Sequence, residues 1–376
     1  MRRQGRAGGF VAAIVVTGLA AGPVAPARAA RAATAAGPAT VCTVSSGRLD
    51  ELSGLAVSGD GYVTIDDSSD DARRRRIFYL TSRCKLSRTV SYPSRTRDTE
   101  DLALAPDGTL WVADTGDNGR SRETVGLWRL APGAAAPVLH RFTYPDGAHD
   151  AEALLLDGDG TPVIVTKDPF TAGVYVPAAA PRAGATVGLR RAGSFAIPGS
   201  STSNPFGVAG RLVVTGGATA ADGSKVALRT YADAFEFKVT DGDVIAAVTT
   251  GKAVATPLPD EPQGESVAYT ADGSGLLTVS ETSDAPGGTK AVIKRYPSAL
   301  PAAVAPSAAP AAASSVAAPS AGAPSVAASQ SPGTAISPRR RLTSGITPTG
   351  LAAITGAAVL VLGVLALALI RLRRRS

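Results

Sequence analysis

The segment Leu102-Ala103-Leu104-Ala105-Pro106-Asp107-Gly108-Thr109-Leu110-Trp111-Val112 places an Asp-Gly pair between two short apolar runs. Asp-Gly between apolar strands is a strong hairpin signal, because both residues tolerate positive φ. The same arrangement recurs where Leu154-Leu155-Leu156 leads to Val163-Ile164-Val165, and where Val267-Ala268-Tyr269 leads to Leu276-Leu277-Thr278-Val279. These stretches predict a series of antiparallel β-hairpins.

The hairpin signal repeats along the chain with a regular period. Asp-Gly pairs stand at Asp60-Gly61, Asp107-Gly108, Asp159-Gly160, Asp222-Gly223 and Asp272-Gly273, with spacings of 47, 52, 63 and 50 residues. A unit of about 50 residues with three or four strands is typical of a propeller blade. We predict an all-β fold, a β-propeller of five blades, with six as the alternative if the longest interval holds another. A β-sandwich would explain the strands but not the repeat.

The two ends of the chain predict export and anchoring. Three early arginines, an apolar run to about residue 21 and Ala27-Arg28-Ala29 are typical of a cleaved signal peptide over residues 1–29. Residues 346–370 carry no charge and are long enough to cross a hydrocarbon core of about 30 Å. The basic residues of 371–376 then predict a cytoplasmic tail.

We therefore expect a single-pass protein of the cell membrane with its N-terminal domain extracellular, and with the membrane as a partner through the C-terminal helix. Ile346-Thr347-Pro348-Thr349-Gly350 resembles a sortase sorting region but departs from the L-P-x-T-G pattern, so wall attachment is the minor alternative. Residues 299–338 are mostly Ala, Pro and Ser, which predicts an extended stalk. The folded domain is expected over residues 40–298.

Charge and cysteine content narrow the expectations for this domain. With the two ends set aside, 27 basic residues face 31 acidic ones, a net charge of about −4, which argues against nucleic acid as a partner. In an exported chain the two cysteines, Cys42 and Cys84, are expected to form a disulfide. The last repeat has room for about three strands, so Val41-Cys42-Thr43-Val44 should supply the fourth strand and close the ring.

Polar residues occupy one register of the repeat. Seven positions before the Asp-Gly pairs stand Ser53, Glu100, Glu152, Thr215 and Glu265, where the first strand of each unit begins. The second strands run back and end near Asp66, Asp114, Lys167, Arg229 and Glu281. Both sets lie opposite the Asp-Gly turns, so we expect them to converge on one mouth of a central channel.

Carboxylates gathered without thiolates suit a hard cation, calcium above all. The predicted ligands are Glu100, Glu152 and Glu265, followed by Asp114, Asp117 and Asn118. In the alternative interpretation, Asp117, Asn118 and the second-strand acids cap turns or pair with Arg122, Lys167 and Arg229.

Two functions from different classes are compatible with such a mouth. One is a binding or scaffolding module for an unidentified envelope or extracellular ligand. The other is a metal-dependent hydrolase of phosphoesters, esters or lactones, with Glu100 or Glu265 as base and with Lys167 and Arg229 holding an anionic substrate. His149, beside Asp150, lies near the mouth, but a solvated loop histidine is the simpler interpretation. The sequence leaves open whether the chain is an enzyme.

The chain resembles a group of exported bacterial β-propeller proteins, mostly uncharacterised and distantly similar to phytase-like esterase and NHL-type propellers. The resembling pieces are Glu51-Leu52-Ser53-Gly54-Leu55-Ala56, Asp98-Thr99-Glu100-Asp101-Leu102-Ala103, Asp114-Thr115-Gly116-Asp117-Asn118, Tyr144-Pro145-Asp146-Gly147, Ala151-Glu152-Ala153-Leu154, Thr166-Lys167-Asp168, Leu228-Arg229-Thr230-Tyr231 and Gln263-Gly264-Glu265. Asp66-Asp67-Ser68-Ser69-Asp70 departs from the N-D-S-G-D form of the group. The resemblance implies the propeller fold over the domain and says little about activity.

Overall fold

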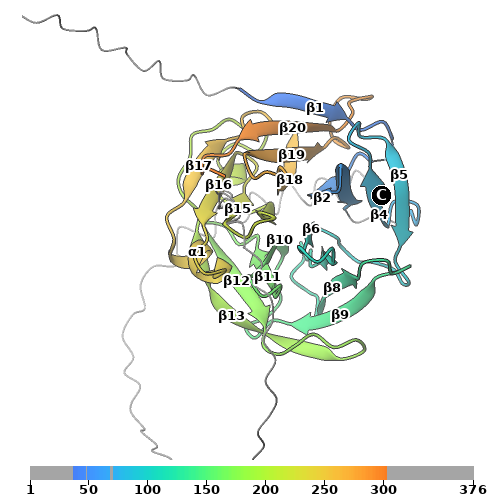
Figure 1. The fold of residues 1–376 in the computed structure, drawn as a ribbon. Helices are drawn as coiled ribbons and strands as arrows, with labels where there is room; N and C mark the ends of the chain where they lie inside the picture. The colour runs from blue at the N-terminus through green and yellow to red at the C-terminus, as the bar shows by residue number, and fades with distance from the viewer. Residues whose placement is uncertain (1–36, 48, 68–70, 303–376) are drawn as a thin grey trace, which may run out of the picture. The chain divides into compact units, whose positions relative to one another are not determined.

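The computed structural model describes residues 37–47, 49–67 and 71–302, and these are nearly all β (Figure 1). The predicted signal peptide, the membrane helix, the basic tail and nearly all of the stalk lie outside the described residues. Within those ranges, no helix has both the length and the apolar character needed to cross a membrane.

Antiparallel meanders of four strands make up the fold. The first contains β2 (Leu52–Ser58), β3 (Gly61–Asp66), β4 (Arg76–Leu80) and β5 (Leu86–Ser91). An eight-stranded sheet holds β6 (Asp101–Leu104), β7 (Leu110–Asp114), β8 (Val125–Leu130) and β9 (Val138–Thr143), and then β10 (Ala151–Leu156), β11 (Pro162–Thr166), β12 (Thr171–Pro177) and β13 (Thr186–Ala196). The strand ladders of its two halves join where β13 pairs with β9 in parallel.

The remaining strands form two further sheets. One contains β14 (Gly216–Thr219), β15 (Lys225–Arg229), β16 (Asp233–Lys238) and β17 (Val254–Pro257), with helix α1 (Val244–Thr250) between the last two strands. The other contains β18 (Gln263–Tyr269), β19 (Gly275–Glu281), β20 (Val292–Pro297) and, from the N-terminal end, β1 (Ala39–Thr43). The longest predicted interval is filled by the eleven-residue β13 and by an irregular segment with the 3-10 turn η1 (Ala209–Arg211).

The first strands of the meanders surround a common axis, as Figure 1 shows. Neighbouring contacts run from β2 to β6, β10, β14 and β18, and from β18 back to β2. Apolar side chains fill the space between successive sheets; for example, Val63, Ile65 and Ile77 pack with Val112 and Trp128. The result is a propeller-like fold whose inner strands carry the residues of the predicted mouth.

The hairpin turns lie where predicted, but their geometry differs. Asp107 does not adopt positive φ; only Gly108 does, at 83°, and its N–H donates to the carbonyl of Ala105 at 2.9 Å. The Asp107 carboxylate instead accepts the backbone N–H of Thr109 at 2.8 Å. The connection therefore has three residues and ends on a left-handed glycine, a common hairpin form in which Asp stabilises the turn by side-chain hydrogen bonding.

The N-terminal strand completes the last sheet. β1 pairs with β20, with Thr40 opposite Lys294 and Thr43 opposite Val292. The predicted disulfide between Cys42 and Cys84 is confirmed, and it links this closing strand to the turn between β4 and β5 of the neighbouring sheet. Both cysteines contact one apolar cluster, so the bond lies inside the packing between the first and last sheets.

Removing the disulfide should weaken ring closure without changing the fold class. In the loop-entropy model a bond across about 40 residues stabilises by roughly 4 kcal/mol. We expect Cys42→Ser with Cys84→Ser to lower the free energy of unfolding by about 2–4 kcal/mol in urea titrations. The reduced wild-type protein should show the same loss, and an unchanged transition midpoint in both samples would contradict this role.

Candidate functional site

Three of the inner strands, β2, β10 and β18, begin with a local irregularity in their ladders. The ladder of β10 and β11 shifts register between Ala151 and Ala153, and that of β18 and β19 shifts between Gly264 and Ser266. The residues skipped by these shifts are Glu152 and Glu265. A β-bulge re-aims the side chain of the extra residue, and bulges are frequent next to functional sites. Two of the three predicted glutamates are therefore presented by bulges.

Carboxylates meet in two groups at this end of the channel. Asp67, Asp98 and Glu100 form one group, and Glu100, Asp150 and Glu152 form the other; in each, ligand oxygens lie within 4.8 Å of one another. Glu100 belongs to both groups. Gly116 leaves the room they need, because a Cβ there would overlap the carboxylates of Glu100 and Asp98. This packing of acids could hold a metal ion.

Glu100 is the least compensated acid of the mouth. It is only 3% exposed, and its carboxylate has no hydrogen bond or ion pair with any other described residue. Burial raises the pKa of Glu100 well above its ordinary value, and Asp67, Glu152, Asp98 and Asp150 raise it further. A buried charge without a partner is costly, so this position is where a bound cation would stabilise the site most.

Only one of the two carboxylate oxygens of Glu152 has a hydrogen-bond partner among the described residues. Its Oε1 accepts from the ammonium of Lys167, while its Oε2 is buried with no hydrogen-bond partner among the described residues. Burial raises the pKa of Glu152 well above normal, despite the opposing charge of Lys167. Lys167 also lies 5.6 Å from the ring centroid of Tyr231. Burial lowers the pKa of Lys167, but Glu152 and the other neighbouring groups raise it well above its ordinary value, so the lysine stays charged.

Glu265 lies on the same rim but has its own partners. Its Oε1 accepts from the hydroxyl of Tyr231 at 3.2 Å and from Nε2 of Gln263 at 3.0 Å. Gln263 also donates to Glu281, whose pKa is raised well above normal by burial and by the charge of Glu265. The acids thus continue around the mouth from Glu152 to Glu281.

The remaining predicted ligands, Asp114, Asp117 and Asn118, belong to neither carboxylate group. Asp114 is buried and accepts from the backbone N–H groups of Arg97 and Asp98, from Arg122 at 3.1 Å and from the indole of Trp128 at 3.2 Å. Asp117 accepts the backbone N–H of Arg122 at 2.8 Å, and Asn118 is exposed. For Asp114 and Asp117 the geometry matches the alternative in which these residues pair and cap turns.

Arg229 is buried within the wall rather than exposed to the channel. Its side chain is fully inaccessible and lies 3.1 Å from Oε2 of Glu261, and its guanidinium donates to the carbonyls of Thr230 and Ser266. A Cβ at Gly264 would overlap the guanidinium. These contacts join β15 to β18, so Arg229 holds two inner strands together.

Asp101, which the repeat register passed over, lies one residue deeper than Glu100. Its Oδ2 accepts from the backbone N–H of Leu154 at 2.8 Å and of Gly217 at 3.0 Å, and its Oδ1 accepts from Leu102. Burial raises the pKa of Asp101 well above normal, although the three N–H donors oppose the shift. One carboxylate therefore ties β6 to both β10 and β14.

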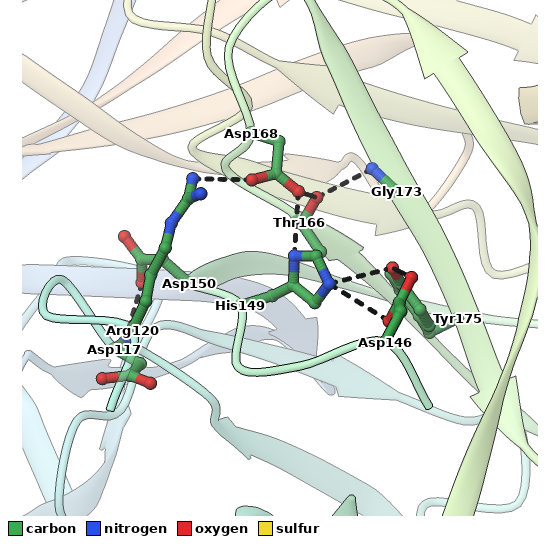
Figure 2. A network of polar contacts seen from close by, with 9 residues as sticks. All are labelled: Asp117, Arg120, Asp146, His149, Asp150, Thr166, Asp168, Gly173 and Tyr175. Carbon is green, nitrogen blue, oxygen red and sulfur yellow. Dashed lines mark hydrogen bonds and ion pairs between the residues drawn. The ribbon is translucent and has the colours of Figure 1, made fainter. Parts of the chain in front are cut away.

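His149 stands beside the second carboxylate group in a network that Figure 2 shows. Its Nδ1 lies 3.1 Å from Asp168, and its Nε2 lies 3.2 Å from Asp146 and 3.1 Å from the hydroxyl of Tyr175. Arg120 pairs with the other oxygen of Asp168 at 2.6 Å. His149 is thus fixed between carboxylates of two loops, not free in solvent, and it secures the loop that carries Asp150.

Three of the residues missed from sequence share a simple spacing. Asp98 and Asp150 stand two positions before Glu100 and Glu152, and Gln263 stands two positions before Glu265. Residues two apart in an extended chain lie on the same face. A repeated acid or amide at this spacing was the signal that could have identified them.

Comparisons with known proteins give no family for this chain. No protein-family model matches the sequence, and neither does any curated protein sequence. A PQQ-bound aldose sugar dehydrogenase from Streptomyces coelicolor is 14% identical, with 69% of this chain and 97% of that chain covered and a TM-score of 0.37. A luciferin-regenerating enzyme is 13% identical, with 66% and 78% covered and a TM-score of 0.39. Virginiamycin B lyase from Staphylococcus aureus is 13% identical, with 68% and 69% covered and a TM-score of 0.33.

The burial of Arg229 gives a stability prediction. Breaking a buried ion pair from one side leaves an uncompensated charge and costs about 3–5 kcal/mol. We expect Arg229→Met to lower the free energy of unfolding by that amount in urea titrations. Adding Glu261→Gln should recover part of the loss, because the orphaned carboxylate is removed. If Arg229→Met left stability unchanged, the side chain would be free for ligand and its assignment as a wall residue would be wrong.

Proposed function

We propose that this chain is a surface-anchored extracellular binding or scaffolding module, a five-bladed propeller whose acidic mouth takes a divalent cation, calcium above all. The observation that carries the proposal is Glu100, which is buried, unpaired among the described residues and shared by both carboxylate groups. A bound cation would supply the charge that its environment lacks. The cation would in turn offer open coordination positions to an anionic or hydroxyl-bearing ligand.

The donor set favours calcium over softer metals. The two groups comprise Asp67, Asp98, Glu100, Asp150 and Glu152, all of which offer oxygen. Calcium accepts six to eight oxygen ligands in flexible geometry, whereas magnesium requires a strict octahedron. Carboxylates spread over several loops and strands suit the more tolerant ion.

The placement of the module rests on the sequence of the two ends. A signal peptide over 1–29 and a membrane helix over 346–370 would put the propeller outside the cell, on the stalk of residues 299–338. The five-blade count treats the eight-stranded sheet as two blades joined by β9 and β13, which agrees with the succession of inner strands β2, β6, β10, β14 and β18. The net negative domain makes nucleic acid an unsuitable partner.

A second candidate, a metal-dependent hydrolase, is favoured by one observation. Lys167 places a charged ammonium beside the second carboxylate group, where it could hold a phosphate or carboxylate of a substrate. Arg229, buried against Glu261, does not take part in this version. Turnover of phosphoester or lactone substrates that disappears in Glu100→Gln and in Glu265→Gln would favour the hydrolase over the binding module.

Cation binding should appear as thermal stabilisation. A ligand at a hundredfold excess over its dissociation constant stabilises the native state by about 2.7 kcal/mol, which for a domain of this size corresponds to a rise in Tm of about 5–10 °C. We expect this rise when Ca²⁺ is added to the EDTA-treated full-length protein. Glu100→Gln and Glu152→Gln should abolish it.

Glu123→Gln is the matched control, because Glu123 is exposed and belongs to neither carboxylate group. It should keep the full calcium response. No shift with Ca²⁺, Mg²⁺ or Mn²⁺ would remove the cation from the proposed function, and an equal loss in the control would show a general charge effect.

Lys167 should compete with the cation, since its ammonium occupies one oxygen of Glu152. Lys167→Met removes that charge with little change in side-chain length. Because like charges a few ångströms apart repel even at a high effective dielectric constant, we expect calcium affinity by isothermal titration to rise by about fivefold or more. Lys252→Met, at an exposed lysine after α1, should change affinity little. Equal gains in the two variants would contradict direct competition.

A further inference from the structure

The opposite end of the inner strands, beside the Asp-Gly turns, holds a cavity of about 490 Å³. Its floor is made by buried apolar side chains at the ends of inner strands: Leu55, Leu102, Ala103, Leu156, Ala218 and Ala268. Cavities of about 300–1,000 Å³ with mostly apolar walls are the usual small-molecule sites of proteins. This cavity shares no lining residue with the two carboxylate groups.

Part of the apolar surface of the wall is accessible to solvent. Val57 and Leu104 line the cavity and are only half-buried. Two threonines of the wall already have partners: Thr219 bonds the backbone of Leu156 at 3.0 Å and 3.2 Å, and Thr270 bonds Asp272 and the N–H of Gly275. The hydroxyl of Tyr269, also in the wall, is buried without a hydrogen-bond partner among the described residues. Apolar surface inside a concave site favours an apolar occupant, at about 25 cal/mol per Å² removed from water.

Among the residues that line the cavity, one carries a charge. Arg88 lines the same cavity, and its guanidinium carbon lies 3.9 Å from the ring centroid of Tyr79. Arg88 is exposed and has no carboxylate partner among the described residues. Stacking on the ring restricts the guanidinium while leaving its N–H groups free, the arrangement that suits bidentate binding of a carboxylate.

We propose that this cavity binds a medium-chain carboxylate, with the straight acyl chain against Leu104, Val57 and the alanine floor and the carboxylate on Arg88. The apolar side chains of the lining would supply the affinity, and Arg88 would fix the orientation. The site is independent of the cation at the other mouth, so either assignment can fail without the other.

Isothermal titration of the full-length protein with decanoate, below its micelle concentration, tests the proposal. Decyltrimethylammonium, which carries a similar tail with the opposite charge, is the comparison ligand. We expect one decanoate per chain and weaker binding of the cationic amphiphile. Arg88→Ala should weaken decanoate by about three- to tenfold, the range for an accessible charge-assisted pair, and should remove the preference between the two ligands.

Arg83→Ala is the matched control, because Arg83 is exposed on the same β4–β5 hairpin but does not line the cavity. It should leave decanoate binding unchanged. Ala105→Trp, which places a large ring in the cavity at a half-buried position, should abolish binding of both amphiphiles while calcium stabilisation persists. No decanoate binding, equal binding of the two amphiphiles, or binding that survives Ala105→Trp would overturn the proposal.

Discussion

Ring closure is the constraint on which the rest of the structure depends. The inner strands can surround an axis only if the first and last sheets meet, and β18 therefore contacts β2. The strand that pairs with β20 is β1, from the N-terminal end of the domain. The last sheet is therefore complete only when the two ends of the domain come together. The Cys42–Cys84 bond secures this step, because it joins the closing strand to the first sheet. Without closure, two sheet edges would stay open to pairing with other chains.

Closure also determines the chemistry at the centre. Inner strands of neighbouring sheets approach closely, so a side chain that begins one of them loses water, as the low exposure of Glu100, Glu152 and Glu265 shows. Burying these carboxylates lowers the stability of the fold. Proteins retain destabilising groups of this kind mainly at functional sites. By contrast Asp101 has three backbone donors, and it contributes to the joining of strands. Two adjacent acids thus differ in role because only one has partners.

The repeat made much of this predictable, and its limits are equally physical. Asp-Gly spacing located the hairpins, and counting back seven residues located Glu100, Glu152 and Glu265 at one end of the inner strands. The same reasoning placed Asp114 and Arg229 correctly along their strands but did not predict the direction of their side chains. Position along a strand gives depth, whereas orientation depends on bulges and on partners from other segments of the chain, such as Trp128 for Asp114 and Glu261 for Arg229. No local pattern encodes those long-range pairings.

The inner strands also explain why the two ends of the channel differ. In β6 the chain runs from acidic Asp101 to apolar Leu104 within four residues, and β18 runs from Gln263 to Tyr269 past a similar change. The sequence of β10 changes in the same way, from Glu152 to Leu156. Because the inner strands point the same way, the glutamates of the inner strands and their apolar ends lie at opposite mouths. The carboxylate of Asp101, bonded to β10 and β14, crosses the centre between them. A polar ligand at one end and an apolar ligand at the other would therefore share the same strands without sharing a contact.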